Sequence, residues 1–330
     1  MSRFSPSPPD TAARLGIHHN GIHWTDLTRN VSEGCERVSP ACMNCWAEGV
    51  ASTRLSHIPG AVGDRYREVT DERGWNRKIV ADPARIPLAF RGIPRTVKGV
   101  DDAPRQPRVW VGSMTDLFHA DVPDTFLDRV FAEMAARPQV YQVLTKRSGR
   151  QAAYAAGRTR RGLVWPSNVW AGVTVEDQER VQRVADLATV PAAVRFVSVE
   201  PMLSAINLSA VRVPDVAAVL TSRWEELGLD RERYRGIPGR LSALDGRVWP
   251  DGAPEAGWLG SAGSVEQVII GSESNGNRPG DRETREEWVI DLIGQCDRVG
   301  AAVFLKQIAI GDRLISLPLI DGRPRADFPA

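Results

Sequence analysis

The sequence is poor in lysine, histidine and cysteine and has almost no net charge. These shortages argue against a strongly basic nucleic-acid- or membrane-binding protein and against a disulfide-rich secreted protein. It contains five histidines and four cysteines, and only four of its 42 basic residues are lysine. With a formal net charge of +1, no strong overall field draws the chain to nucleic acid or to an anionic membrane. Four cysteines in 330 residues, three of them close together, do not suit a disulfide framework, so we expect a cytoplasmic protein.

The N-terminal segment lacks an apolar core. Residues 1–10 are rich in Ser and Pro, so we expect neither a signal peptide nor a membrane span, and no membrane partner. We interpret residues 1–20 as a disordered lead-in and residues 21–330 as a single domain. A hydrophobic content of 42% in a chain of this length is enough for a sizeable core.

Short apolar runs alternate with helical patterns from residue 109 onward, which is typical of a parallel sheet covered by helices. The predicted strands are Val109–Met114, Tyr141–Thr145, Val169–Val175, Arg195–Val199, Gln267–Gly271 and Ala302–Leu305. Up to three earlier strands, one of them at residues 21–25, would complete the set. The pattern predicts an α/β fold, namely a complete or partial (β/α) TIM-like barrel.

An open doubly wound sheet is the alternative architecture. It is disfavoured because no Gly-rich dinucleotide-binding or P-loop fingerprint follows any of the strands. The rhythm of strands and helices breaks at residues 208–264, which are rich in Gly, Pro and Arg. We interpret this segment as an insertion, which is either a lid or binding loop or a surface excursion without a role in the site.

Three of the four cysteines lie in the loop 34–46 with the spacing C-x6-C-x2-C: Cys35, Cys42 and Cys45. Thiolates this close in sequence are rarely there for packing, and soft sulfur ligands select iron–sulfur clusters, zinc or copper(I). A four-iron cluster on three cysteines keeps one iron free for a substrate or cofactor. In a zinc site, His57 or His23 could supply the fourth ligand. We favour the cluster and keep zinc as the alternative.

Polar side chains follow six successive predicted strands, where the chemistry of a parallel barrel is found. They are Ser113, Thr115, Asp116, His119, Thr145, Lys146, Arg147, Thr174, Glu176, Ser198, Glu200, Ser272, Glu273, Ser274, Lys306 and Gln307. Our candidates for catalysis are Glu176, Glu200, Lys146 and His119. The alternative for each is a structural role, as a helix N-cap or in an ion pair at the rim of the barrel.

Several separate motifs, in this order, resemble those of the phage-associated three-Cys-motif family, which is similar to radical S-adenosylmethionine (SAM) enzymes. The resemblance covers about Trp24 to Gln307, without the insertion. The motifs are Gly34–Glu48 with its three cysteines, Val111–His119, Gln142–Arg147, Asn168–Glu176, Glu200–Leu203, Gly271–Ser274 and Arg278–Pro279.

The resemblance implies a [4Fe-4S] cluster on Cys35, Cys42 and Cys45, with SAM bound to the open iron. An electron from a donor would cleave SAM to methionine and a 5′-deoxyadenosyl radical, which abstracts hydrogen from a substrate, so we expect an enzyme. The polar residues that would hold SAM are Ser113, Asp116, Glu176, Glu200, Ser272 and Glu273. Lys146 and Lys306 would take its carboxylate or a substrate phosphate.

The cysteine loop departs from the commonest radical SAM pattern. That pattern has the spacing C-x3-C-x2-C and an aromatic residue before the last cysteine, whereas Asn44 stands there in this chain and Trp46 follows the cysteine. The longer first gap is compatible with cluster binding.

The expected substrate is a nucleic acid or nucleotide, because of the phage association and the supply of arginine, whose guanidinium matches phosphate. Some of the ten tryptophans could serve as base-stacking platforms. Two other functions stay open. One is a zinc-binding, non-catalytic nucleic-acid-binding module, and the other is a (β/α) hydrolase whose cysteines are incidental.

Overall fold

The computed structural model describes residues 2–17, 22–220, 230–252, 259–276 and 278–329. The chain divides into two units, and each is described by itself. The cysteine unit consists of Pro8–Arg150 and Pro166–Trp170. The carboxylate unit consists of Met1–Ser7, Gln151–Trp165 and Ala171–Ala330. No helix within the described ranges is both long and apolar enough to cross a membrane.

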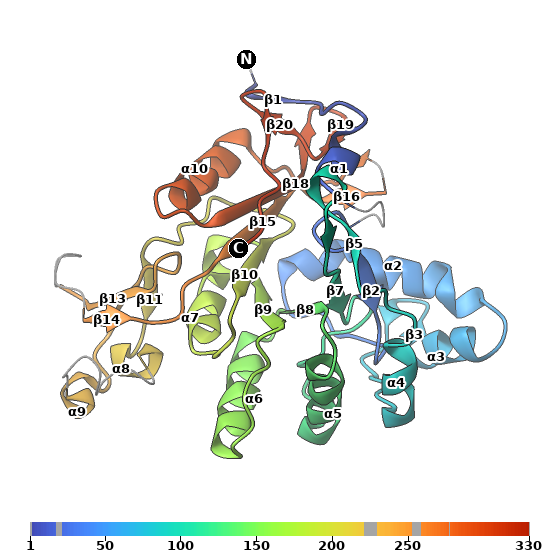
Figure 1. Cartoon of the computed structure of the whole chain (residues 1–330), viewed down its shortest axis with the longest axis horizontal. Helices are drawn as coiled ribbons and strands as arrows, with labels where there is room; N and C mark the ends of the chain where they lie inside the picture. The colour runs from blue at the N-terminus through green and yellow to red at the C-terminus, as the bar shows by residue number, and fades with distance from the viewer. Residues whose placement is uncertain (1, 18–21, 221–229, 253–258, 277, 330) are drawn as a thin grey trace. The chain divides into compact units, whose positions relative to one another are not determined.

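The main sheet is mostly parallel, and its eight strands follow the order β19-β18-β15-β10-β9-β8-β7-β2 (Figure 1). Strand β9 (Val169–Thr174) begins in the cysteine unit and ends in the carboxylate unit. This confirms the predicted α/β class. The strand order has two ends, β19 and β2, so closure into a barrel stays a prediction.

The cysteine unit contains three parallel strands, β2 (Leu27–Arg29), β7 (Arg108–Val111) and β8 (Val140–Thr145). Its helices are α1 (Thr11–Arg14), α2 (Trp46–Thr53), α3 (Ala61–Val69), α4 (Ile86–Ala89) and α5 (Asp124–Ala135). Two short hairpins complete it, β3 (Thr70–Asp71) with β4 (Gly74–Trp75) and β5 (Val97–Lys98) with β6 (Pro104–Arg105). Helix α5 buries Phe126, Leu127, Val130, Phe131 and Met134, the apolar stripe of an amphipathic helix.

The first strand of the sheet lies at Leu27–Arg29, and residues 22–25 form no strand. The prediction of a strand at residues 21–25, of which residue 21 lies outside the described residues, was therefore wrong. Thr25 and Asp26 instead hold the start of β7 through their side chains. Thr25 Oγ1 donates to the carbonyl of Arg108 and accepts from the N–H of Trp110, both at 3.1 Å. Asp26 Oδ2 accepts from the N–H of Arg108 at 2.7 Å. These side-chain hydrogen bonds pair the start of β7 with the residues before β2, and the backbone of β2 then pairs with the rest of β7.

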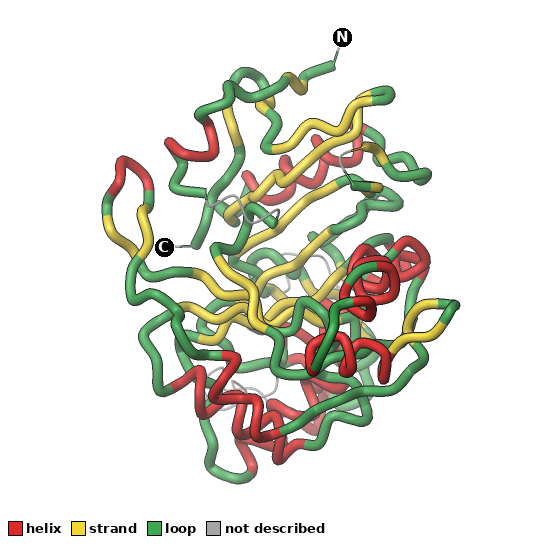
Figure 2. Tube along the Cα trace, turned by 90° about the vertical axis from the view of Figure 1, so that its right-hand side faces the viewer, coloured by secondary structure: helices red, strands yellow, loops and turns green. Residues whose placement is uncertain are grey.

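The carboxylate unit contains the parallel strands β9, β10 (Arg195–Val199), β15 (Gln267–Gly271) and β18 (Ala302–Ile310), which are labelled in Figure 1. Figure 2 draws the strands of the protein in yellow. The antiparallel strand β19 (Arg313–Ser316) follows β18. Helix α6 (Ser148–Arg160) starts in the cysteine unit, while α7 (Arg183–Ala188) contacts β10 and α10 (Glu286–Asp297) contacts β18. Part of the N-terminal segment also forms structure, because β1 (Phe4–Ser5) pairs with β20 (Leu319–Ile320), which in turn pairs with β21 (Arg323–Pro324).

The insertion forms a small antiparallel sheet of its own (Figure 1). Its strands are β11 (Val211–Val213), β12 (Gly239–Leu241), β13 (Arg247–Pro250) and β14 (Gly260–Ser261), with the short helices α8 (Val216–Val219) and α9 (Arg231–Tyr234). Val211, Val213, Val216, Leu241 and Val248 are fully buried. The predicted range 208–264 therefore includes a module with an apolar centre. Residues 221–229 and 253–258 of this range lie outside the described residues.

Candidate functional site

The first cysteine follows a backbone clamp. Glu33 exchanges two backbone hydrogen bonds with Val80, at 3.0 and 2.9 Å, and the N–H of Gly34 donates to the carbonyl of Met114 at 3.2 Å. Gly34 has φ +98°, and a Cβ at this position would lie 2.0 Å from the carbonyl oxygen of Lys78. Only glycine fits both the backbone angle and the close approach. Cys35 is thereby held beside the segment that follows β7.

The other two cysteines lie just before helix α2 begins at Trp46. Cys42 is in a short 3-10 helix (Pro40–Asn44), and its Sγ lies 3.6 Å from the Oγ of Ser39. Cys45 is the N-cap of α2, and its carbonyl accepts the N–H of Gly49 at 3.1 Å. The positive end of the helix dipole at Cys45 favours an anionic group bound there.

The three thiols share one electrostatic neighbourhood. Burial raises the pKa of Cys35 to about 12, with smaller contributions from the charges of Asp116 and Cys45, while Arg147 opposes the shift. The hydrogen bond to Glu48 raises the pKa of Arg37, and the charges of Cys45 and Cys42 act in the same direction. A metal that binds Cys35 must therefore displace a proton from a buried thiol.

Three thiols form a donor set that fits a soft metal or an iron–sulfur cluster. Within the ranges that the structure describes, however, no three His, Cys, Asp or Glu side chains are arranged as a metal-binding group. His57, one of the two histidines considered for zinc, has its Nδ1 3.1 Å from the Oγ of Ser56. The residues match the chemistry of the group, and their side chains would have to reorient to coordinate it.

Asp116 connects the cysteine loop to the end of β8. Its Oδ1 accepts from Thr145 Oγ1 at 2.6 Å and from the N–H of Phe118 at 3.0 Å. Its Oδ2 accepts from the N–H of Lys146 at 3.2 Å and from Arg147 at 3.3 Å. Arg147 also donates to the carbonyl of Glu36 at 3.4 Å. Because both carboxylate oxygens are occupied, Asp116 is suited to positioning its neighbours.

His119 is buried beside the same loop. The N–H of Asp121 donates to its Nδ1 at 3.2 Å, which places the proton of the neutral ring on Nε2. Nε2 lies 3.8 Å from Glu36 Oε2 and has no hydrogen-bond partner within the described residues. Burial lowers the pKa of His119, and the charge of Arg147 lowers it further. The ring is thus a neutral N–H donor at neutral pH.

The structure brings Cys35, Asp116 and His119 together through Glu36 and Arg147. Two other predicted residues of the cysteine unit join through different contacts. Ser113 Oγ donates to Asn30 Oδ1 at 3.3 Å. Lys146 joins through its backbone, and its ammonium makes no ion pair in the part of the chain described here.

In the carboxylate unit, Glu200 and Lys306 form an ion pair at the strand ends. Lys306 Nζ lies 2.9 Å from Glu200 Oε1, and Ser198 donates to Oε2 at 3.2 Å. A Cβ on Gly271, which ends the intervening strand β15, would lie 2.8 Å from Glu200 Oε1. The glycine therefore leaves the space that the carboxylate occupies between β10 and β18.

Glu176, which follows β9, is fully buried. Its Oε2 accepts from Arg183 at 2.7 Å, and Arg183 also donates to the carbonyl of Thr174 at 2.7 Å. Its Oε1 has no hydrogen-bond partner within the described ranges. Buried polar atoms are normally paired, so this oxygen is suited to accept a hydrogen bond from a bound group.

Ser272 and Glu273 make contacts that favour structural roles. Ser272 Oγ accepts the N–H of Ala309 at 3.0 Å, and its carbonyl accepts from Gln307 at 2.7 Å. Glu273 is ion-paired with Arg282, whose N–H also donates to Oε2 at 3.2 Å. Their assignment to cofactor binding stays a prediction.

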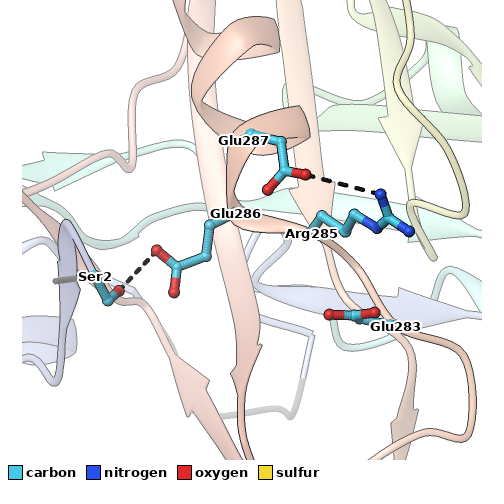
Figure 3. A pocket seen from close by; sticks show the side chains of 5 residues that line it. All are labelled: Ser2, Glu283, Arg285, Glu286 and Glu287. Atoms are coloured by element: carbon cyan, nitrogen blue, oxygen red, sulfur yellow. Dashed lines mark hydrogen bonds and ion pairs between the residues drawn. The ribbon is translucent and has the colours of Figure 1, made fainter.

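A separate hollow of about 600 Å³ in the carboxylate unit contains none of the predicted residues (Figure 3). It is lined by Ser2, Glu283, Arg285, Glu286 and Glu287. Ser2 donates to Glu286 at 2.8 Å, and Arg285 faces Glu287 at 4.0 Å. Its polar groups bond one another at the start of α10, and nothing in it indicates a ligand.

Asn30, Glu36 and Arg183 are site residues that the sequence did not indicate, and Arg147 was named only as one of the polar residues that follow a strand. Asn30 accepts from the N–H of Met114, 84 positions away, and Arg147 bonds the carbonyl of Glu36, 111 positions away. Contacts over such separations have no local sequence signal. Only Arg147 and Glu36 carried a hint, since they adjoin Lys146 and Cys35.

The fold and the site define an α/β protein with a mostly parallel sheet and a three-cysteine loop beside a buried aspartate–arginine pair. The chain belongs to the family described as "Protein of unknown function (DUF5131)", whose model matches residues 19–313. No curated protein and no solved structure matches the chain.

Proposed function

We propose that this protein is a radical SAM-like iron–sulfur enzyme built on a complete or partial (β/α) barrel. Cys35, Cys42 and Cys45 would hold a [4Fe-4S] cluster, which leaves one iron for SAM. The observation that carries the proposal is a set of three thiols within eleven positions of the chain, with Cys45 as the N-cap of α2 and close enough to Cys35 for its charge to raise the pKa of that thiol. A zinc site is the competing assignment for the same thiols.

When bound, the cluster would supply the electron for reductive cleavage of SAM, received from a cytoplasmic electron donor. The chain's own residues would position and shield the reactants. Arg37 and Arg147 place positive charge beside the thiols, and Asp116 holds Arg147. His119 offers its Nε2–H. These roles follow from the contacts of each side chain within the cysteine unit.

Three groups at the strand ends of the carboxylate unit would bind polar parts of SAM or substrate. The Glu200–Lys306 pair offers a carboxylate and an ammonium 2.9 Å apart. The ammonium suits a carboxylate or phosphate, and the carboxylate suits an amino group. Glu176 adds a buried carboxylate oxygen that has no donor within the described residues. The substrate we propose is a nucleic acid or nucleotide.

Electron paramagnetic resonance after anaerobic reconstitution tests this function. We expect a brown protein that absorbs at about 400 nm and, once reduced, gives a cluster signal that SAM changes. Cys42→Ala should abolish the signal. Cys296→Ala is the matched control, because Cys296 is buried in α10 and should leave the signal intact. A colourless protein with one tightly bound zinc per chain would overturn the proposal.

A further inference from the structure

The cysteine loop presents an unusual amount of apolar surface to solvent. Val38 is 42% exposed, Met43 61% and Trp46 50%, all within nine positions of the chain. Large apolar side chains gathered at one exposed place mark a surface that meets another molecule. We call these three residues the Trp46 surface.

Trp46 is supported from behind by two further tryptophans. Its ring centroid lies 6.5 Å from that of Trp110, at an interplanar angle of 57°. Trp110 in turn lies 5.0 Å from Trp24, whose side chain is 1% exposed. These tilted ring contacts connect Trp46 to the interior of the cysteine unit, while half of its side chain stays exposed. A fixed aromatic ring loses little conformational freedom when a flat molecule stacks on it.

Cationic side chains border the same loop. Arg77 is 80% exposed and lies 3.4 Å from Glu36. Lys78, whose carbonyl contacts Gly34, is exposed, and its ammonium makes no ion pair in the described part of the chain. Arg37 lies above the first turn of α2, bonded to Glu48. Cations that border a loop carrying an exposed aromatic ring supply the two elements that single-stranded nucleic acids require, positive charge and a stacking surface.

We propose that the Trp46 surface binds single-stranded nucleic acid, with one base stacked on Trp46 and the adjoining phosphates on Arg77 and Lys78. The inference rests on the proposed function, since it names the substrate class delivered to the three-cysteine site. Stacking tolerates any base, so the surface sets position along the strand without reading its sequence. Cys45 directly precedes Trp46, which brings a stacked base next to the cysteine loop.

Fluorescence anisotropy with labelled dT12 and U12 oligonucleotides tests the proposal. Trp46→Ala should weaken binding between about fivefold and about 150-fold, the range for one stacked base, and Trp46→Phe should restore most of it. The double variant Arg77→Ala, Lys78→Ala should reduce the slope of log K against log salt concentration by the amount expected for the loss of about two phosphate contacts. Trp288→Ala is the control, because Trp288 is a partly exposed tryptophan of the carboxylate unit that packs against Arg285.

Three results would overturn this proposal: no oligonucleotide binding, equal binding by wild type and Trp46→Ala, or an equal loss in Trp288→Ala. Binding of free SAM or adenosine that depends on Trp46, with no binding of oligonucleotides, would also overturn it and assign the ring to a cofactor. Iron content is measured on the same samples. If the protein holds a normal cluster but binds no oligonucleotide, only the proposed role of the Trp46 surface is refuted. If it binds oligonucleotides through Trp46 but contains no iron, only the proposed enzyme function is refuted.

Discussion

Gly34 determines where the first thiol lies. Its positive φ and its approach to the carbonyl of Lys78 leave no room for a side chain. Glu33, just before it, is buried and ion-paired with Arg65 and Arg85, which fixes the same turn from the other side. The backbone conformation of Gly34 therefore affects both the stability of the loop and the position of Cys35.

Replacing Gly34 with alanine should destabilise the protein by about 2 to 4 kcal/mol, because a backbone clash adds to the cost of a positive φ. Urea unfolding measures the change. Gly92→Ala is the matched control, since Gly92 has φ +70° but no atom lies within 4 Å of the place a Cβ would take there, and it should cost only about 1 kcal/mol. Equal losses in the two variants would contradict the clamp described for Gly34.

Asp26 makes stability depend on pH. Burial alone would raise its pKa, but the hydrogen bond from Arg105 and the charge of Arg108 lower it below the ordinary value. A lowered folded-state pKa means that the stabilisation is present above the unfolded-state pKa of about 3.9 and is lost as the pH falls through the folded-state value.

The free-energy difference between wild type and Asp26→Asn should therefore be on the order of 1 to 3 kcal/mol at pH 6 and shrink below about pH 4. Urea unfolding across this range measures it, with the exposed Asp10→Asn as control. A difference that stays constant or grows as the solution is acidified would show that the Asp26 carboxylate is not stabilised by its two arginines.

At the scale of helices and strands, the positions of several strands could be predicted from the sequence. The side-chain hydrogen bonds that hold the strands in place could not. The strands Arg195–Val199 and Gln267–Gly271 form where predicted, because a buried parallel strand is an almost continuous apolar run. The strand predicted at residues 21–25 lies at Leu27–Arg29, since Thr25 and Asp26 bond to β7 through side chains that a hydropathy pattern does not register.

The candidate site divides in the same way. Asp116 and His119 were found from their place just after a strand, which parallel topology makes informative. Their partners could not be found, because Glu36 meets them only through the fold. Ser272 and Glu273 satisfy the same positional rule and make contacts that favour structural roles, so their assignment to cofactor binding stays a prediction. A position just after a strand therefore identifies the polar residues at the strand ends, but it does not distinguish residues that bind a ligand from residues that stabilise the fold.

The Glu200–Lys306 pair connects strands β10 and β18 across Gly271, and a double-mutant cycle should detect it. Glu200→Gln and Lys306→Met should each destabilise the protein, and the double variant should lose less than their sum, with a coupling free energy on the order of 1 kcal/mol. Urea denaturation of the four proteins supplies the values. Additive effects would mean that the 2.9 Å contact contributes nothing to the strand ends.

At the scale of the whole molecule, the family model covers residues 19–313, which include most of both units and the whole insertion. The three thiols belong to the cysteine unit, and Glu176, Glu200 and Lys306 belong to the carboxylate unit. The proposed role of each set rests on the contacts within its own unit.

Metal stoichiometry after anaerobic purification tests the central claim most directly. Iron, acid-labile sulfide and zinc are measured per chain in wild type, Cys42→Ala and Cys296→Ala. The account predicts about four irons and four sulfides in wild type and Cys296→Ala, and neither in Cys42→Ala. One zinc per chain, or iron that remains bound in Cys42→Ala, would contradict a cluster held by Cys35, Cys42 and Cys45.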